Sequence, residues 1–415
     1  MTHTRPNILW IVTTQWRAQA TGYSGDPNAR TPHLDSFASQ SVNYAQAVTP
    51  HPFGPFARAA MLTGVPSPEN GVRDYYDPLP AEARTVADEL RTQGYATGFF
   101  GKWHLYERDR RADLVGPAHA RIVVPPGRHG GFEFWEGFES GFLLNDPWLH
   151  GVRLPEPVQF PGYQSDVVCE RAAGWMTDAR PWFCVVSLEP PHPPYDAPVP
   201  PGGARRNPSG IVLAGNVPRG GEIEATARRE LAGYYAHIEA TDRAIGRLLA
   251  AVRCDETVVV FTSVHGDLHG AHGLFRKGWP YEESVRVPLL VRTPGGTSAG
   301  GGTSSQALVS LIDLPAMTRR WASGGGFAPE AGANFQSISM PGAVRLPRQC
   351  DQAWRGARTR TRKLVLGANG MPWLCFDLER DPGEQSNLRD DPPRAGEMDA
   401  LWRALHPALH SAPAA

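Results

Sequence analysis

The sequence predicts an α/β fold in which a large mixed, mostly parallel sheet is flanked by helices and followed by a small C-terminal α+β subdomain. Short apolar runs rich in β-branched residues alternate with amphipathic helical patterns, which is typical of α/β proteins. Several runs are apolar at every position, as expected for strands covered on both faces. The last ninety or so residues contain short strand patterns. We therefore expect an α/β domain over residues 1–325 and a subdomain over residues 326–415.

Four runs are the predicted strands of the large sheet. The first has the sequence NILWIV, and the others are equally rich in Val, Phe and Trp. Such runs of six or seven residues favour buried strands over helices, because helices are longer and leave polar positions on one face. The predicted strands are residues 7–12, 95–100, 182–188 and 257–262.

Three helices are predicted between these strands. Residues 85–93 begin with Thr85 and Asp88, which are spaced as an N-terminal capping pair, and Gly94 stands at the C′ position. Residues 229–251 carry Leu, Tyr and Ile at helical spacing, so they predict a long amphipathic helix. Residues 31–40 are the third predicted helix.

The C-terminal subdomain is expected to contain a small antiparallel sheet and a terminal helix. Residues 363–366 and 373–378 are predicted strands, and the Gly-Ala-Asn-Gly sequence between them is a turn signal. Gly- and Pro-rich residues 198–221 and 295–305 are predicted surface loops. The boundary is expected near residues 324–332.

Composition excludes several classes of protein. The chain has 41 Lys and Arg residues against 42 Asp and Glu, a net charge of −1, whereas nucleic-acid and membrane-surface proteins carry a basic excess. The five cysteines are scattered, which disfavours a disulfide framework or zinc site. The N-terminus has no signal-peptide pattern and no apolar stretch is long enough to span a membrane. We expect a cytoplasmic protein; the sequence does not specify its oligomeric state.

Polar side chains follow each predicted strand of the large sheet. Because parallel strands place their carboxyl ends at one edge, where ligands bind, we expect these side chains to form one site. Two of the three lysines in the chain are among them, together with three histidines and few carboxylates, so the expected ligand is an anion. The residues are Thr13, Thr14 and Gln15; Lys102 and His104; His192; and Ser263, His265, Asp267 and Lys277.

Six sequence blocks then show a family resemblance. The chain resembles the sulfatase family of the alkaline phosphatase superfamily, which includes the formylglycine sulfatases and phosphonate monoester hydrolases. The blocks are long, occur in the family order and extend from residue 5 to residue 388. They are RPNILWIVTTQWRAQATGYSG, TPHLDSFASQSVNYAQAVTPHPFGPFARAAMLTG, GKWHL, PPHPPY, HGDLHGAHGLFRKGWPYEESVRVPLLVR and FDLERDPGEQSNL.

The resemblance implies a nucleophile and a metal that this chain lacks the residues to provide. Family members convert a cysteine to formylglycine and hold calcium or manganese with aspartates. Here Gly54 stands at the cysteine position, and Thr14 and Val264 stand at the two aspartate positions. The retained Gln15 and His265 offer one oxygen and one nitrogen, whereas hard cations prefer several charged oxygens. We expect a degenerate member with no metal and no cofactor.

The cationic residues of the family are retained. Arg58, Lys102, Lys277 and His192 are the predicted anion-binding residues, and Lys102, His104, His192, His265 and Lys277 are the predicted catalytic residues. Buried lysines without an anion are expected to have lowered pKa values, which would suit a general base. Thr13, Gln15 and His51 are further possible pocket residues.

Two functions fit this pattern. The first is a metal-independent, formylglycine-independent enzyme, expected in specialised metabolism, that acts on a small anionic substrate bearing a sulfate, phosphate or carboxylate. Its acid/base chemistry would be an elimination, isomerisation, cyclisation or group transfer. The alternative is an inactive pseudo-sulfatase that binds an anionic ligand or a partner protein.

Structural roles are the simpler interpretation of several other residues. We expect a helix-start role for His33, loop ordering for His272 and core packing for the aromatic run that contains Trp135 and Trp148; the alternative for these tryptophans is a place in the wall of a pocket. Asp267 is expected to accept hydrogen bonds within its loop.

Overall fold

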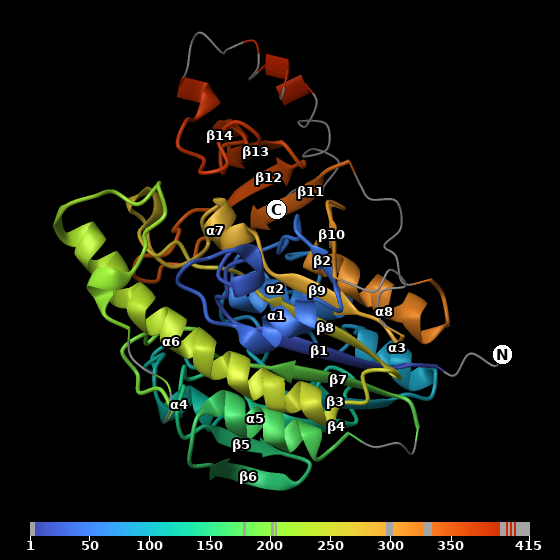
Figure 1. The fold of residues 1–415 in the computed structure, drawn as a ribbon. Helices are drawn as coiled ribbons and strands as arrows, with labels where there is room; N and C mark the ends of the chain where they lie inside the picture. The colour runs from blue at the N-terminus through green and yellow to red at the C-terminus, as the bar shows by residue number, and fades with distance from the viewer. Residues whose placement is uncertain are drawn as a thin grey trace.

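The computed structural model describes residues 5–176, 180–200, 203, 206–295, 302–326 and 334–390, with positions 396, 399, 400, 402 and 403. Its largest element is a ten-stranded sheet in the order β10-β2-β9-β8-β1-β7-β3-β4-β5-β6 (Figure 1). The five central strands β8, β1, β7, β3 and β4 are parallel, and the strands beyond them run antiparallel, apart from β10 on β2. The strands are β1 Asn7–Thr13, β2 Val42–Tyr44, β3 Ala96–Lys102, β4 Phe134–Phe138, β5 Trp148–Gly151, β6 Leu154–Gln159, β7 Trp182–Ser187, β8 Thr257–Ser263, β9 Leu289–Arg292 and β10 Thr303–Ser305.

Helices cover both faces of this sheet. The long helix α6 and helix α5 lie side by side along one face, together with α1 (Figure 1). Helices α2, α3 and α8 pack on the other face. The helices are α1 Pro32–Ala38, α2 Gly54–Thr63, α3 Val86–Thr92, α4 Pro117–Ala120, α5 Gln164–Ala173, α6 Gly221–Ala251, α7 Glu282–Val285 and α8 Leu314–Ala322.

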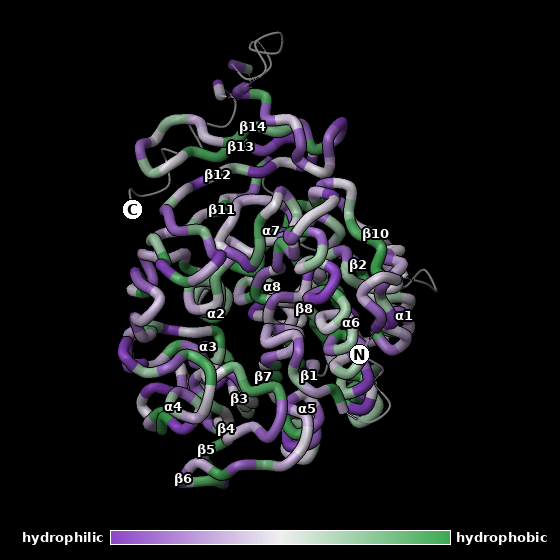
Figure 2. Tube along the Cα trace, turned by 90° about the vertical axis from the view of Figure 1, so that its left-hand side faces the viewer, coloured by the Kyte–Doolittle hydropathy of each residue, from purple (hydrophilic) through white to green (hydrophobic). Residues whose placement is uncertain are grey.

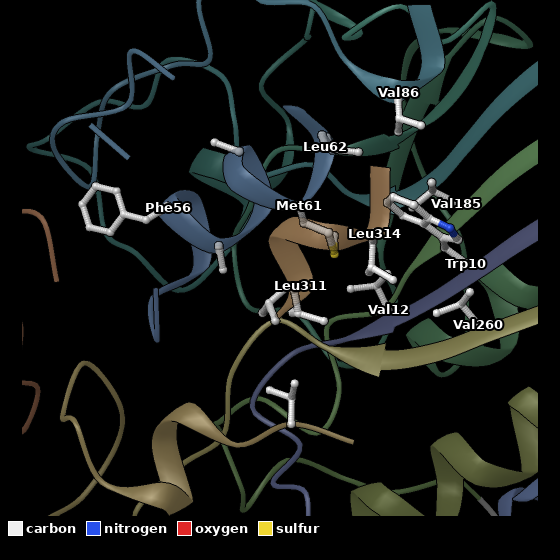
Figure 3. Packing of buried hydrophobic residues seen from close by; sticks show 14 of the residues in the cluster. Trp10, Val12, Phe56, Met61, Leu62, Val86, Val185, Val260, Leu311 and Leu314 are labelled. Carbon is white, nitrogen blue, oxygen red and sulfur yellow. The ribbon is translucent and has the colours of Figure 1, made fainter. Parts of the chain in front are cut away.

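The side chains of β1 alternate between two hydrophobic cores. Trp10 and Val12 point to the α2, α3 and α8 side, where they pack against residues such as Leu62 and Leu314 (Figure 3). Leu9 and Ile11 belong to the cluster on the opposite face. All these β1 side chains are fully buried. A strand enclosed in this way must be apolar at every position, which explains the run NILWIV.

The four predicted strands and three predicted helices are confirmed, with small differences at their ends. Thr85 caps α3 in the expected capping box, and Gly94 follows the helix with φ of 84°. Helix α6 begins at Gly221, eight residues before the predicted start at residue 229. The prediction began late because the first two turns of the helix are polar and lack the amphipathic pattern.

A second sheet follows the first along the chain. Strands β11 Gln336–Met340, β12 Trp354–Arg358, β13 Arg362–Gly367 and β14 Pro372–Asp377 form an antiparallel sheet in that order. β11 is its strand nearest to the large sheet (Figure 2). The sheet confirms the predicted small C-terminal sheet. The division at residue 325 remains a prediction, and most of the expected terminal helix lies outside the described residues. Among the described residues, no helix has the length and apolar character needed to cross a membrane.

Candidate anion-binding site

The carboxyl ends of the central strands open into a cavity of about 800 Å³. The five residues predicted to be catalytic all line it, although they come from four different segments of the chain. Thr14 and Gly54 line it as well. The structure thus brings these side chains together; their catalytic and binding roles stay predictions. The five are Lys102, His104, His192, His265 and Lys277.

Lys277 is a buried amine whose partners are all uncharged. Its Nζ donates a hydrogen bond to Gln15 Oε1 and lies 3.1 Å from His192 Nε2. The other ring nitrogen of His192, Nδ1, is 2.7 Å from Pro193 O and therefore carries the proton, which leaves Nε2 as an acceptor. Burial, reinforced by the charge of Lys102, lowers the pKa of Lys277 to about 7. Both protonation states of this amine are therefore populated near neutrality.

Lys102 differs because it has a carboxylate partner. Its Nζ is 2.7 Å from Glu189 Oε1, and both side chains are almost completely buried. Burial lowers the pKa of Lys102 to about 8, although the charge of Glu189 opposes this shift. Nζ also lies 4.6 Å from the centre of the Phe142 ring.

His104 occupies the space beside Gly54. A Cβ atom added at Gly54 would lie 2.9 Å from His104 Nδ1, closer than real Cβ contacts. Neither ring nitrogen of His104 has a hydrogen-bond partner among the described residues. Burial, together with the charges of Lys102 and Arg108, holds the pKa of His104 well below its usual value. The ring is therefore neutral, and one nitrogen is a free acceptor at the start of helix α2.

The side chains at the metal positions of the family do not fit calcium or manganese. Val264 has no donor atom and is packed into a hydrophobic cluster. Thr14 Oγ1 donates to Leu188 O and accepts from Arg58, while Gln15 Oε1 accepts from Lys277. Only His265 keeps a free donor atom, Nε2. One imidazole nitrogen beside a lysine amine does not form a site for a hard cation.

Asp267 does not supply the missing carboxylate. Its Oδ2 accepts from the Gln15 amide and the Tyr195 hydroxyl, and its Oδ1 accepts from the backbone N–H groups of His269 and Arg276. Although burial acts in the opposite direction, the charges of His269 and Arg276 hold its pKa well below the usual range. The prediction that Asp267 is a hydrogen-bond acceptor within its loop is confirmed.

The expectation of few carboxylates around the cations was wrong. Glu189 pairs with Lys102, and Glu139 is 2.6 Å from Arg108 Nη1 next to the site. These acids balance charge that would otherwise be buried alone, which is costly in a protein interior. Glu189 directly follows the predicted strand 182–188, so the search beyond strand ends could have found it; Tyr75 in the wall carried no sequence signal.

Six of the residues predicted for the site do not line the cavity: Arg58, Thr13, Gln15, His51, Ser263 and Asp267. Arg58 lies beneath it and donates to Ser187 Oγ, Lys102 O and Thr14 Oγ1. Thr13 Oγ1 donates to Thr262 O between two strands. His51 accepts from Ser67 N and lies against β11, because the chain turns away before α2 begins.

The residues for which we expected structural roles lie outside the cavity lining. His33 is exposed on α1, and Trp135 is buried in the core, as expected. Trp148 packs against Arg121 rather than lining the cavity. His272 lies against Tyr281, outside the cavity lining.

Comparisons with known proteins agree with this architecture. The sulfatase family model matches residues 6–324. The chain belongs to the sulfatase family. It is 32% identical to the ulvan-active sulfatase of Formosa agariphila over 98% of this chain and 81% of that protein.

Solved structures of two other proteins share the fold. The yidJ protein of Bacteroides fragilis superposes with a TM-score of 0.82 at 24% identity, covering 98% of this chain and 96% of that one. The phosphonate monoester hydrolase of Agrobacterium radiobacter gives a TM-score of 0.71 at 22% identity, covering 97% and 96%. This sulfatase-family chain therefore has the family fold, with Gly54 and Thr14 lining its cavity and Val264 packed in a hydrophobic cluster.

Proposed function

We propose that this sulfatase-family protein is a metal-independent, formylglycine-independent enzyme acting by acid/base chemistry on a small anionic substrate. The relative that is 32% identical is named a sulfatase, which supports a sulfate, or another small anionic group such as a phosphate or carboxylate, as the group that is bound. Lys102 and Lys277 bind it, since each supplies an amine to the cavity. At the metal positions of the family, Gln15 Oε1 is occupied by Lys277 and His265 offers a single nitrogen. These side chains do not suit calcium or manganese, which supports chemistry without the family metal.

The observation that carries the proposal is the neutral His104 ring beside Gly54. A side chain at position 54 would collide with this imidazole, so glycine is the residue that leaves room for it. His104 accepts a proton from the substrate, because its ring is neutral and one nitrogen is a free acceptor. Lys277, in its charged form, returns a proton to the developing product anion.

Proton transfer of this kind supports an elimination, an isomerisation or a cyclisation. Anion binding converts Lys277 to its charged form, because an opposite charge nearby favours the ammonium state. The acid is thus prepared by anion binding, while the neutral base is already present. No step requires a nucleophile at position 54.

One contact favours the alternative of an inactive protein that binds an anionic ligand. Lys102 is already paired with Glu189 at 2.7 Å, so an incoming anion must share this cation. A binding protein tolerates that competition, whereas it weakens charge stabilisation during a reaction.

The test combines binding with turnover. Inorganic sulfate and phosphate are titrated calorimetrically, and small sulfate, phosphate and carboxylate compounds are screened by NMR for products. We expect Lys277→Met to weaken binding, and His104→Ala to retain binding but lose at least about 100-fold in turnover. His33→Ala, an exposed histidine, is the matched control. Turnover that appears only with added calcium or manganese would contradict the proposal, and binding without any turnover would favour the inactive alternative.

A further inference from the structure

A second polar cluster lies outside the anion cavity. It joins the segment after β8 to the C-terminal sheet through His272, Glu283 in α7 and Glu384 after β14. One ligand atom of each residue lies within 4.8 Å of those of the other two. Within the described part of the chain, no other group of three His, Cys, Asp or Glu residues has this arrangement.

Glu283 has a buried oxygen without a partner. Its side chain is 9% exposed, and Oε2 makes no hydrogen bond among the described residues. This oxygen lies 3.9 Å from His272 Nε2 and so faces the cluster. The other oxygen, Oε1, accepts from Asn216 Nδ2 at 2.7 Å. A buried carboxylate oxygen that has no hydrogen-bond donor is costly, and here it faces an imidazole nitrogen. A cation or a proton between the two atoms would remove this cost.

Nearby donors are fully used. Asn216 Nδ2 has two hydrogens but lies near three acceptors: Glu283 Oε1, His272 Nε2 and Gly383 O. Lys363 Nζ has three hydrogens, which serve Pro280 O, Glu384 Oε1 and Glu282 Oε1. Glu384 Oε2 accepts from Glu282 N, so the carboxylate oxygen of the cluster that is left without a donor is Glu283 Oε2, which faces His272.

We propose that His272, Glu283 and Glu384 bind one divalent transition-metal ion, for which Zn²⁺ is the natural probe. One imidazole and two carboxylates form a ligand set that zinc accepts, with metal–ligand distances of about 2.0–2.2 Å. Ligand atoms around one such ion lie about 3–4 Å apart, so binding draws these side chains slightly inward. A harder ion such as calcium is disfavoured by the imidazole and the small number of oxygens.

Two features prepare the site. His272 has a left-handed backbone, with φ of 57°, and its ring stacks on Tyr281 at 3.9 Å, which fixes the direction of the imidazole. His272 and Glu384 also line a cavity of about 380 Å³ beside β14, through which an ion can enter.

The bound ion would connect three parts of the fold. His272 and Glu283 lie at the two ends of the segment that carries Lys277, and Glu384 follows the C-terminal sheet. A metal bridge therefore fixes the segment and sheet together, with a structural role. The inference does not depend on the chemistry proposed for the anion cavity.

The experiment measures zinc binding to the full chain after treatment with chelator and removal of that chelator. Calorimetry of the wild-type protein is expected to give one Zn²⁺ per chain, and the melting temperature is expected to rise with zinc. His272→Ala and Glu283→Gln should each weaken zinc binding at least about tenfold and lose the thermal shift. Glu283→Gln keeps the side-chain shape, so it remains informative if His272→Ala folds poorly.

Matched variants decide between the outcomes. His33→Ala removes an exposed histidine and should bind zinc like the wild type, whereas His265→Ala and His192→Ala remove histidines of the anion cavity and should also leave zinc binding unchanged. The proposal is overturned if the wild type binds no zinc, since a proton then satisfies the glutamates. Zinc binding lost only in the cavity variants would overturn it too, because the ion would then lie in the anion cavity.

Discussion

The three lysines of this chain are all buried, yet they lie in two very different environments. In the anion cavity, Lys277 contacts an amide oxygen and a neutral imidazole, while Lys102 contacts one carboxylate. Between the two sheets, Lys363 contacts Glu282, Glu384 and a backbone carbonyl. The charge of Lys363 is compensated by two carboxylates, whereas that of Lys277 has no carboxylate partner.

This difference separates a structural lysine from a binding lysine. A buried ammonium group with carboxylates on either side holds the fold together, because each charge satisfies the other. One without a carboxylate partner has a lowered pKa and gains a partner only when an anion enters. Regions that are electrostatically unsatisfied in this way are typical of functional sites.

Lys363→Met is expected to have the largest effect on stability. It leaves Glu282 and Glu384 buried with one fewer cation, which costs about 3–5 kcal/mol in comparable cases. Urea denaturation of the variant and the wild type measures the difference. A cost below about 1 kcal/mol would show that Arg358, which also pairs with Glu282, is sufficient.

Lys277→Met is the matched substitution in the cavity. It removes a charge that has no carboxylate partner, so we expect a change in unfolding free energy near zero or a small gain at neutral pH. A loss similar to that of Lys363→Met would contradict the distinction between the two environments.

Gly54→Ala tests the packing of the cavity with a smaller effect. The added methyl group would collide with the His104 ring. If the ring cannot turn away, we expect the free energy of unfolding to fall by about 1–3 kcal/mol. NMR of the imidazole resonances, together with urea denaturation, measures both consequences. Gly127→Ala is the control, because nothing lies within 4 Å of a Cβ at that position. Unchanged His104 resonances in the Gly54 variant would show that the ring does not depend on glycine.

The sequence predicted the central strands because each is buried on both faces and has an unambiguous apolar pattern. It missed short strands near one edge of the sheet, such as β2 and β10, which have three residues each and depend on tertiary pairing. Strand ends predicted which cations meet in the cavity, since parallel strands end at one edge.

The sequence could not predict how those side chains are compensated. The Lys102–Glu189 pair depends on rotamers at the ends of two neighbouring strands. Contact between His104 and Gly54 depends on the left-handed backbone of His104, with φ of 58°. Neither distance follows from spacing along the chain.

The pH dependence of the free energy of unfolding tests the same difference between the environments of Lys277 and Lys363, with the smallest expected effect. Lys277 has a pKa of about 7 in the folded protein against 10.5 for an ordinary lysine. Between these pH values the unfolded chain binds more protons, so the free energy of unfolding rises with pH, by at most about 1.4 kcal/mol per pH unit for this group. Below pH 7 both states are protonated and the cost of burying the charge is fully present. Urea denaturation should therefore show that the free energy of unfolding of the wild type rises relative to that of Lys277→Met between pH 7 and pH 9. A difference that stays constant over this range would mean that Lys277 remains charged in the folded cavity.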